Sequence, residues 1–206
     1  MKSMMNSRFL VFALLAILVV SSASAYVLLS PRRTWDSAPR VIVDSRGQSS
    51  ITDSDHGASR TASAILAWNN AGAGTRLSSS VGSVSGWRLG DGIPMLNFTD
   101  PQNACKGSCL AATFTGYYSQ RSDGTYRITD ADIVTNGRYA WTSVGEPDGC
   151  SSEFYIEGVM THEVGHLLGL AHSNVTGATM YPSVSSCNNG PASLENDDKA
   201  AISDLY

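Results

Sequence analysis

Apolar residues recur along this chain at both helical and strand-like spacings, which predicts a domain that mixes helices and strands. In residues 61–70, Ala64, Ile65 and Trp68 recur at intervals of three and four, so we expect a helix with one buried face. Short apolar runs predict strands at residues 41–43, 96–98 and 111–118. An Asp-Gly pair in residues 121–124 predicts the turn that follows the last of these strands.

Three further segments in the second half of the chain have a readable pattern. Residues 128–135 alternate apolar and polar positions irregularly and precede an Asn-Gly pair, which predicts a strand. Residues 154–168 and 194–206 predict helices. Residues 72–86 are rich in Gly and Ser, so we expect a loop there and no second domain.

The first 25 residues have the pattern of a secretory signal. A basic start precedes an apolar run at residues 9–20, which is short for a membrane span. Ala23-Ser24-Ala25 suits signal cleavage before Tyr26, with an uncleaved anchor as the alternative. We therefore expect a single domain, residues 26–206, that works outside the cytoplasm, either in the medium or in a periplasm.

The chain is mildly acidic, with a formal net charge of -4 at pH 7. Removal of the basic leader would make the remainder more negative, and its charges are spread along the sequence. This distribution gives no electrostatic reason to bind nucleic acid or an anionic membrane, so we expect neither as a partner once the leader is removed.

The chain has four cysteines, an even number that in an exported protein favours two disulfides. Three pairings are possible, and we favour Cys105–Cys109 together with Cys150–Cys187. The second bond would tie the chain before the helix at 154–168 to a loop after it. A four-cysteine zinc site is the alternative, although the spacing lacks paired C-x-x-C units.

The most specific chemical signal is the string H-E-V-G-H-L-L-G-L-A-H, which ends at His172. On a helix, His162 and His166 lie one turn apart on one face, where both can bind one zinc ion at about 2.0–2.1 Å. Glu163 points about 100° away and can instead take a proton from metal-bound water. A continuous helix would carry His172 about 15 Å along the axis, so it has to end, and Gly169 can make that turn.

This string resembles the signature of the metzincin zinc peptidases, which continues to a methionine turn. Met180 lies eight residues after His172 and would form an apolar floor beneath the metal. Within metzincins, Met180-Tyr181-Pro182 and residues 194–198 resemble the matrixin branch, the matrix-metalloprotease-like enzymes, in a minimal form of bacterial type. Pro182 stands where two other branches place a tyrosine ligand, which argues against those branches.

The resemblance implies an α+β fold, the sandwich-like catalytic domain of zincins. Such a domain has a twisted, mostly parallel five-stranded sheet with one antiparallel edge strand, a backing helix, an active-site helix and a C-terminal helix. An extended substrate pairs with the edge strand nearest the cleft. We assign residues 128–135 to that strand, with Ile133 and Val134 as cleft candidates; an ordinary strand of the sheet is the alternative. Residues that resemble the outer wall of the pocket after the scissile bond are Pro182, Ser183 and Val184.

The function that the resemblance implies is that of a secreted endopeptidase acting on extended proteins or peptides. One catalytic zinc would be held by His162, His166 and His172, with Glu163 as general base, and we expect the chain to act as a monomer. One alternative is a catalytically modest zinc-containing module that binds proteins, against which the intact Glu163 argues. Another is a zinc hydrolase of non-protein amides.

Other polar residues define what else the site could contain. Only His56 lies outside the motif among four histidines, so a second histidine-rich zinc site is not expected. The stretch after the leader holds no cysteine that could block the zinc. Asp53 and Asp55 could bind calcium, but their spacing matches no standard calcium loop, and capping explains such residues more often. Asp197 or Asp198 is expected to bind the backbone near the methionine turn or to cap the last helix.

Overall fold

The computed structural model describes residues 25–54, 56–72, 76–84, 86–143 and 150–206. The proposed signal segment, apart from Ala25, lies outside these residues. Within the described residues, no helix is both long and apolar enough to cross a membrane. The elements in chain order are β1 (Arg33–Thr34), β2 (Arg40–Asp44), α1 (Ala58–Asn70), β3 (Ser78–Gly82), β4 (Met95–Asn97), β5 (Ala111–Gln120), β6 (Tyr126–Thr135), β7 (Trp141–Thr142), β8 (Phe154–Tyr155), α2 (Ile156–Leu168), the 3-10 helix η1 (Gly190–Ala192) and α3 (Asn196–Leu205).

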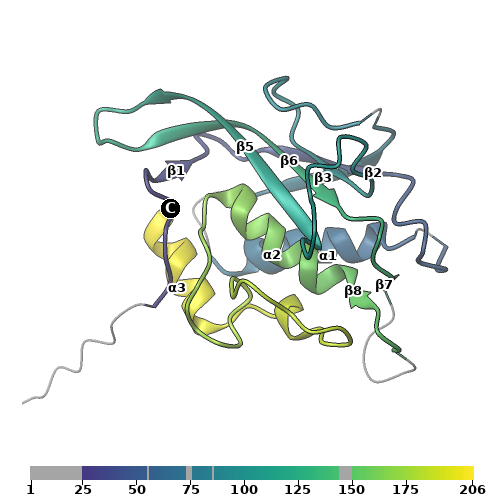
Figure 1. Ribbon diagram of the computed structural model, residues 1–206. Coiled ribbons are helices and arrows are strands. Elements are labelled where there is room, and N and C mark those ends of the chain that lie inside the picture. Colours follow the sequence, from purple (N-terminus) through teal and green to yellow (C-terminus); the bar gives the residue numbers. More distant parts are fainter. Residues whose placement is uncertain (1–24, 55, 73–75, 85, 144–149) are drawn as a thin grey trace, which may run out of the picture.

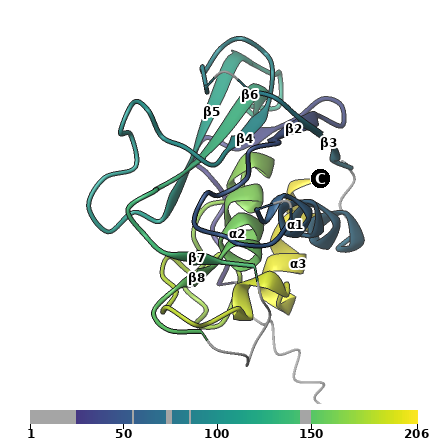
Figure 2. The same ribbon diagram turned by 90° about the vertical axis from the view of Figure 1, so that its right-hand side faces the viewer.

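One twisted sheet forms a layer, and helices α1 and α2 pack side by side against one of its faces (Figure 1, Figure 2). The strands lie in the order β5, β6, β4, β2, β3, and every pairing is parallel except that of β5 with β6. The short β1 pairs with the other end of β6, beside β4. The predicted mostly parallel sheet with an antiparallel edge strand is therefore confirmed, with β1 as an additional strand.

The edge strand is β5, so the assignment of residues 128–135 to the edge of the sheet was wrong. These residues belong to β6, which has β5 along one side and β4 along the other. Ile133 and Val134, expected in the cleft, are fully buried on opposite faces of the sheet. A strand with partners on both sides has no free backbone groups to offer a peptide, so neither residue can bind substrate as predicted.

The polar residues of β6 explain this error. Asp130 and Asp132 alternate with apolar residues, as on a half-exposed strand, yet both are completely buried. The segment between β3 and β4 covers this face of the sheet, where the backbone N–H groups of Gly90 and Asp91 donate to Asp130 Oδ2 over 2.6 and 3.2 Å. The two aspartates therefore lie on a face of the sheet that is covered by backbone N–H donors, not on a face that is open to water.

The Gly- and Ser-rich segment also holds an element that was not expected. Within residues 72–86, β3 pairs with β2 over five consecutive positions, Arg40 with Ser78 through Asp44 with Gly82. Its composition shows no apolar alternation because β3 is the far edge strand and most of its side chains are exposed. Main-chain hydrogen bonds rather than side-chain packing hold it in the sheet.

The two packed helices form the core beneath the sheet. On α1, which begins three residues earlier than predicted, Ala64, Ile65 and Trp68 are buried as expected. The Trp68 indole N–H donates to the carbonyl of Thr161 on α2 over 2.7 Å. A buried indole needs such an acceptor, and this one fixes α1 against the helix that carries two of the histidines.

We expect the substitution Asp132→Asn to stabilise the folded chain above neutral pH. Burial, and then the nearby charges of Asp130 and Asp91, raise the pKa of Asp132 to about 7 from an ordinary 3.8. The unfolded chain therefore loses this proton at lower pH than the folded chain, and the free energy of unfolding falls as pH rises from about 4 to 7. At about 1.4 kcal/mol per pKa unit, the gain at pH 8 should reach a few kcal/mol.

Thermal melting of both proteins between pH 4 and pH 8 measures this effect. The exposed carboxylate of Asp204, paired with Arg32, provides the control Asp204→Asn, for which we expect no comparable gain at high pH. An equal difference between Asp132→Asn and the unchanged chain at pH 4 and pH 8 would contradict the assignment.

Candidate active site

Helix α2 places two histidines on one face because its opposite side is apolar. Ile156, Met160 and Val164 recur every four residues and are completely buried. The imidazoles of His162 and His166 project from the other side, with ring centroids 4.7 Å apart. The helical prediction for this stretch is confirmed, although the helix begins at Ile156, after the two-residue strand β8.

Gly169 ends α2 and turns the chain back toward the two histidines. It has φ of 106°, and its N–H donates to the carbonyl of His166 over 2.9 Å. A side chain here would be strained by this φ, and its Cβ would lie 2.1 Å from the carbonyl oxygen of Arg33. The turn brings His172 to ring-centroid distances of 5.2 Å from His162 and 4.8 Å from His166. The predicted helix break is thus at Gly169.

The three imidazoles suit one zinc ion. Their candidate ligand atoms all lie within 4.8 Å of one another. The Nδ1 atoms of His162 and His166 lie 2.7 and 2.8 Å from the carbonyls of Thr179 and Leu170. A proton on each Nδ1 satisfies these carbonyls and leaves both Nε2 atoms free for a metal. Burial lowers the pKa of both rings to about 4, so they are neutral at pH 7, the form that binds zinc.

Met180 packs against Gly165, a glycine of the motif on the helix that carries His162 and His166. Its side chain is buried, and a Cβ added to Gly165 would lie 2.3 Å from its sulfur and 2.8 Å from Cζ2 of Trp68. Only glycine at this helix position lets Met180 and Trp68 approach so closely. Sequence reasoning assigned no role to Gly165, since a single glycine inside a helix carries no signal of what packs against it.

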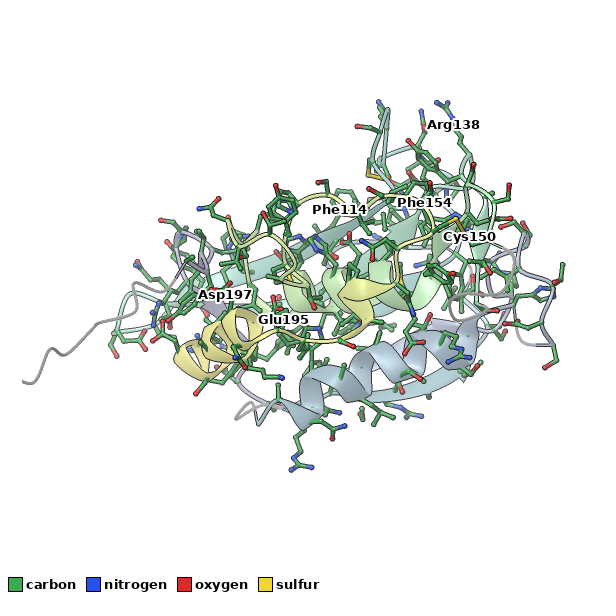
Figure 3. The ribbon with its side chains drawn as sticks, turned by 90° about the horizontal axis from the view of Figure 1, so that it is seen from below. Phe114, Arg138, Cys150, Phe154, Glu195 and Asp197 are labelled. Atoms are coloured by element: carbon green, nitrogen blue, oxygen red, sulfur yellow. A yellow bond between two sulfur atoms is a disulfide. The ribbon has the colours of Figure 1, made fainter. Side chains whose placement is uncertain are left out.

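The carboxylate of Asp198 holds the turn that contains Met180. Its two oxygens accept the N–H groups of Thr179 over 2.8 Å and Met180 over 3.0 Å. Asp198 also accepts the N–H of Glu195 over 2.9 Å and so caps α3. Both roles expected for one of the two aspartates therefore belong to Asp198. Its neighbour Asp197, which lies with Glu195 at the start of α3 in Figure 3, instead accepts a 2.6 Å hydrogen bond from the Ser173 hydroxyl.

The Glu163 carboxyl group is nearly buried beside the histidines, at 5% exposure. The hydroxyl of Thr113 on β5 donates to its Oε2 over 2.6 Å. Burial raises the pKa of Glu163, while the charge of His166 and the Thr113 hydrogen bond act in the opposite direction. Thr113 was missed because its proximity to Glu163 depends on how β5 lies across α2, which no local pattern in the sequence shows.

A pocket of about 530 Å³ opens beside the three histidines. Pro182, Ser183 and Val184 line it, as the resemblance implied, whereas Ile133 and Val134 do not. The remaining lining residues come from the loop before β5, from the start of β5, from two aromatic residues before α2, from α2, from the loop after α2 and from η1. They are Ser108, Cys109, Leu110, Ala111, Tyr139, Phe154, Gly158, Val159, His162, Glu163, His172, Thr179, Tyr181 and Pro191.

Both expected disulfides are present and both border this region. Cys105–Cys109 closes a small loop just before β5, and Cys150–Cys187 joins the chain before β8 to the loop after Met180. Figure 3 shows Cys150 close to Phe154, which lines the pocket. Within the described residues, the other group that could hold a metal consists of Cys150, Glu153 and Cys187. The sulfurs of the two cysteines are bonded to each other in the disulfide, so they are not free to bind a metal.

The residues considered for calcium have structural partners instead where they can be described. Asp53 Oδ1 accepts the N–H of Gly57 over 2.9 Å, directly before α1. His56 Nδ1 lies 2.5 Å from the carbonyl of Ile51, away from the three clustered histidines. Asp55 lies outside the described residues. Asp53 therefore holds the loop before α1 through the N-cap residue Gly57 and is not itself the N-cap of the helix.

Comparison with known proteins gives one family match. The model of the family described as Matrixin matches residues 96–206, more than half of the chain. The chain is 45% identical to metalloendoproteinase 2-MMP of Arabidopsis thaliana over 126 residues, which are 55% of this chain and 33% of that protein. It is 44% identical to rat matrilysin over 66 residues (32% and 23%) and 50% identical to karilysin of Tannerella forsythia over 48 residues (23% and 10%). The matched segments thus span a third or less of these relatives.

We expect Asp198→Asn to weaken zinc binding. The amide presents N–H donors where backbone N–H groups of Thr179 and Met180 now point at carboxylate oxygens, so at least one of these hydrogen bonds is lost. Because the Thr179 carbonyl orients His162, the zinc dissociation constant should rise about 10-fold or more. Competition with a chromogenic chelator measures it.

The neighbouring substitution Asp197→Asn is the matched control. It makes the same chemical change on the same helix, and an asparagine can still pair with the Ser173 hydroxyl. Equal zinc affinities for the two variants would show that Asp198 does not support the metal site.

Proposed function

Because the chain belongs to the matrixin family, we propose that it is a zinc-dependent endopeptidase that hydrolyses peptide bonds of extended protein substrates. The observation that carries this proposal is the meeting of three neutral imidazoles with the buried carboxyl group of Glu163 at one end of an open pocket. Binding of a metal alone would not need a general base beside it. The two disulfides also support a location outside the cytoplasm, as expected for a secreted enzyme.

His162, His166 and His172 would hold the metal as three neutral ligands and leave one position open. Zinc bound there supplies Lewis acidity, which makes water a better nucleophile and polarises the scissile carbonyl. The carbonyls of Thr179 and Leu170 keep two of the rings in place through their Nδ1 atoms. This geometry suits a single catalytic zinc.

Glu163 moves the proton in the proposed reaction. Its carboxylate takes a proton from the attacking water as the water oxygen bonds to the carbonyl carbon. The carbon–nitrogen bond then breaks, and Glu163 gives the proton to the leaving nitrogen, so the products are a carboxylic acid and an amine. Burial raises the pKa of Glu163, which makes its carboxylate a stronger base for the proton of the attacking water.

The substrate is proposed to lie along β5 rather than β6. Among the described strands β5 pairs only with β6, so its other side is open for an extended peptide. Leu110, just before β5, and Ala111, its first residue, line the pocket that contains the histidines. A peptide paired with β5 would pass over Glu163. The side chain that follows the cleaved bond would then enter the pocket, whose walls include Val159 and Val184, so we expect an apolar residue at that position of the substrate.

We expect Glu163→Gln to keep one zinc per chain and to lose at least about 100-fold in turnover, because the amide cannot accept the proton. His166→Ala should instead lose zinc, since it removes one of three ligands. Metal analysis together with casein digestion, with and without a chelator, separates the two effects. Near-full activity of Glu163→Gln would overturn its role, and an unchanged protein that binds zinc but cleaves no peptide library would favour a binding module or a hydrolase of other amides.

Pairing of the substrate with β5 predicts a selective effect of backbone methylation. In an extended peptide, successive N–H groups point in opposite directions, so only alternate ones can face β5. Methylation of such an N–H should raise KM about 10-fold through loss of one hydrogen bond. Methylation of the adjacent residue on the same side of the cleaved bond is the control, and equal KM values for both peptides would argue against pairing with β5.

A further inference from the structure

Thr113 joins the strand proposed to bind substrate to the proposed base. Its hydroxyl lies 2.6 Å from Oε2 of Glu163 and 3.0 Å from the main-chain carbonyl of the same residue. A hydroxyl has one proton to donate, and the shorter contact is with the charged acceptor, which gives the stronger hydrogen bond. The contact crosses from β5 to α2 between residues 50 apart in sequence.

This hydrogen bond engages one of the two carboxylate oxygens. A glutamate side chain has three rotatable bonds and can swing its carboxylate through a wide arc unless something holds it. Thr113 fixes Oε2 and thereby determines where Oε1 points. A general base must lie within hydrogen-bond reach of the proton it takes, so this orientation bears directly on the reaction.

The position of Thr113 on the strand makes the contact rigid. Thr113 pairs with Ile133 of β6, a fully buried residue in the middle of the sheet. Its neighbour Phe114 points to the opposite face of β5, where its ring stacks on Trp87 with centroids 4.7 Å apart. With β6 on one side and Trp87 on the other face, the strand cannot rotate to withdraw the hydroxyl from Glu163.

We propose that Thr113 is a positioning residue that holds the Glu163 carboxylate in register with a peptide bound along β5. The inference rests on the proposed endopeptidase function. Thr113 itself touches neither substrate nor metal in this role. It sets the distance and direction between the strand that fixes the peptide and the group that moves the proton.

Thr113→Val removes the hydroxyl and keeps the shape, so it should lower kcat by about 10-fold or more while KM changes by less than about 3-fold. Thr113→Ser restores the hydroxyl and should recover kcat to within about 3-fold of the unchanged chain. Zinc content should stay at one per chain in both variants. In a Glu163→Gln background, Thr113→Val should cause no further loss, since the base is already absent.

Thr115→Val is the matched control, because Thr115 lies on the same face of β5 and its hydroxyl accepts from Arg33 instead. The proposal is wrong if Thr113→Val keeps kcat within about 2-fold, if Thr115→Val lowers kcat equally, or if serine fails to rescue. Loss of zinc in Thr113→Val would also overturn it, in favour of a structural role. If the unchanged chain cleaves no peptide, the proposed function fails separately. A crystal structure of Thr113→Val then tests the positioning role. The proposal requires that the Glu163 carboxylate is displaced in this variant relative to the unchanged chain.

Discussion

The reversal of the chain at the end of α2 is the constraint on which the rest of the site depends. Three imidazoles can share one ion only if the third returns to the helix face that carries the first two. Gly169 permits this reversal, and the carbonyl of Arg33 occupies the space where any other residue would place its Cβ. The last carbonyls of a helix have no partner within the helix. Here the carbonyl of Leu167 accepts the Trp35 indole N–H, and that of Leu168 accepts the Tyr206 hydroxyl. Segments near both ends of the described chain thus meet at this helix end.

The chain after the reversal has little regular structure, so polar contacts must hold it. Between His172 and the start of α3 the only regular element is the short helix η1. One buried carboxylate, that of Asp198, satisfies two backbone N–H groups of the Met180 turn and one at the start of α3. A neutral side chain cannot accept three N–H groups as effectively, which explains why an acidic residue lies fully buried here.

The sequence predicted the clustering of the histidines better than the order of the strands. The three histidines, Glu163, the turn at Gly169 and Met180 lie within nineteen residues, and helix geometry relates those that precede Gly169. Strand order is not a local property. The buried Asp130 and Asp132 made β6 look half exposed, and only the segment that covers them shows otherwise. Thr113 and Gly165 escaped notice for the same reason, since their neighbours are distant in sequence.

This division between local and distant contacts has a consequence for the cleft. The three histidines and Glu163 lie on α2 and in the turn after it, whereas the pocket also takes walls from the loop before β5, from Phe154 just before α2 and from the loop after Met180. The two disulfides restrain all three of these walls. Cys105–Cys109 lies in the loop before β5, and Cys150–Cys187 ties the chain before α2 to the loop after Met180. Irregular walls of this kind would otherwise have few packed contacts to fix them, and cross-links reduce the conformations open to such loops. The histidine cluster therefore depends on α2 and on the polar contacts of the turn after it, while the loops that line the pocket are restrained by covalent bonds.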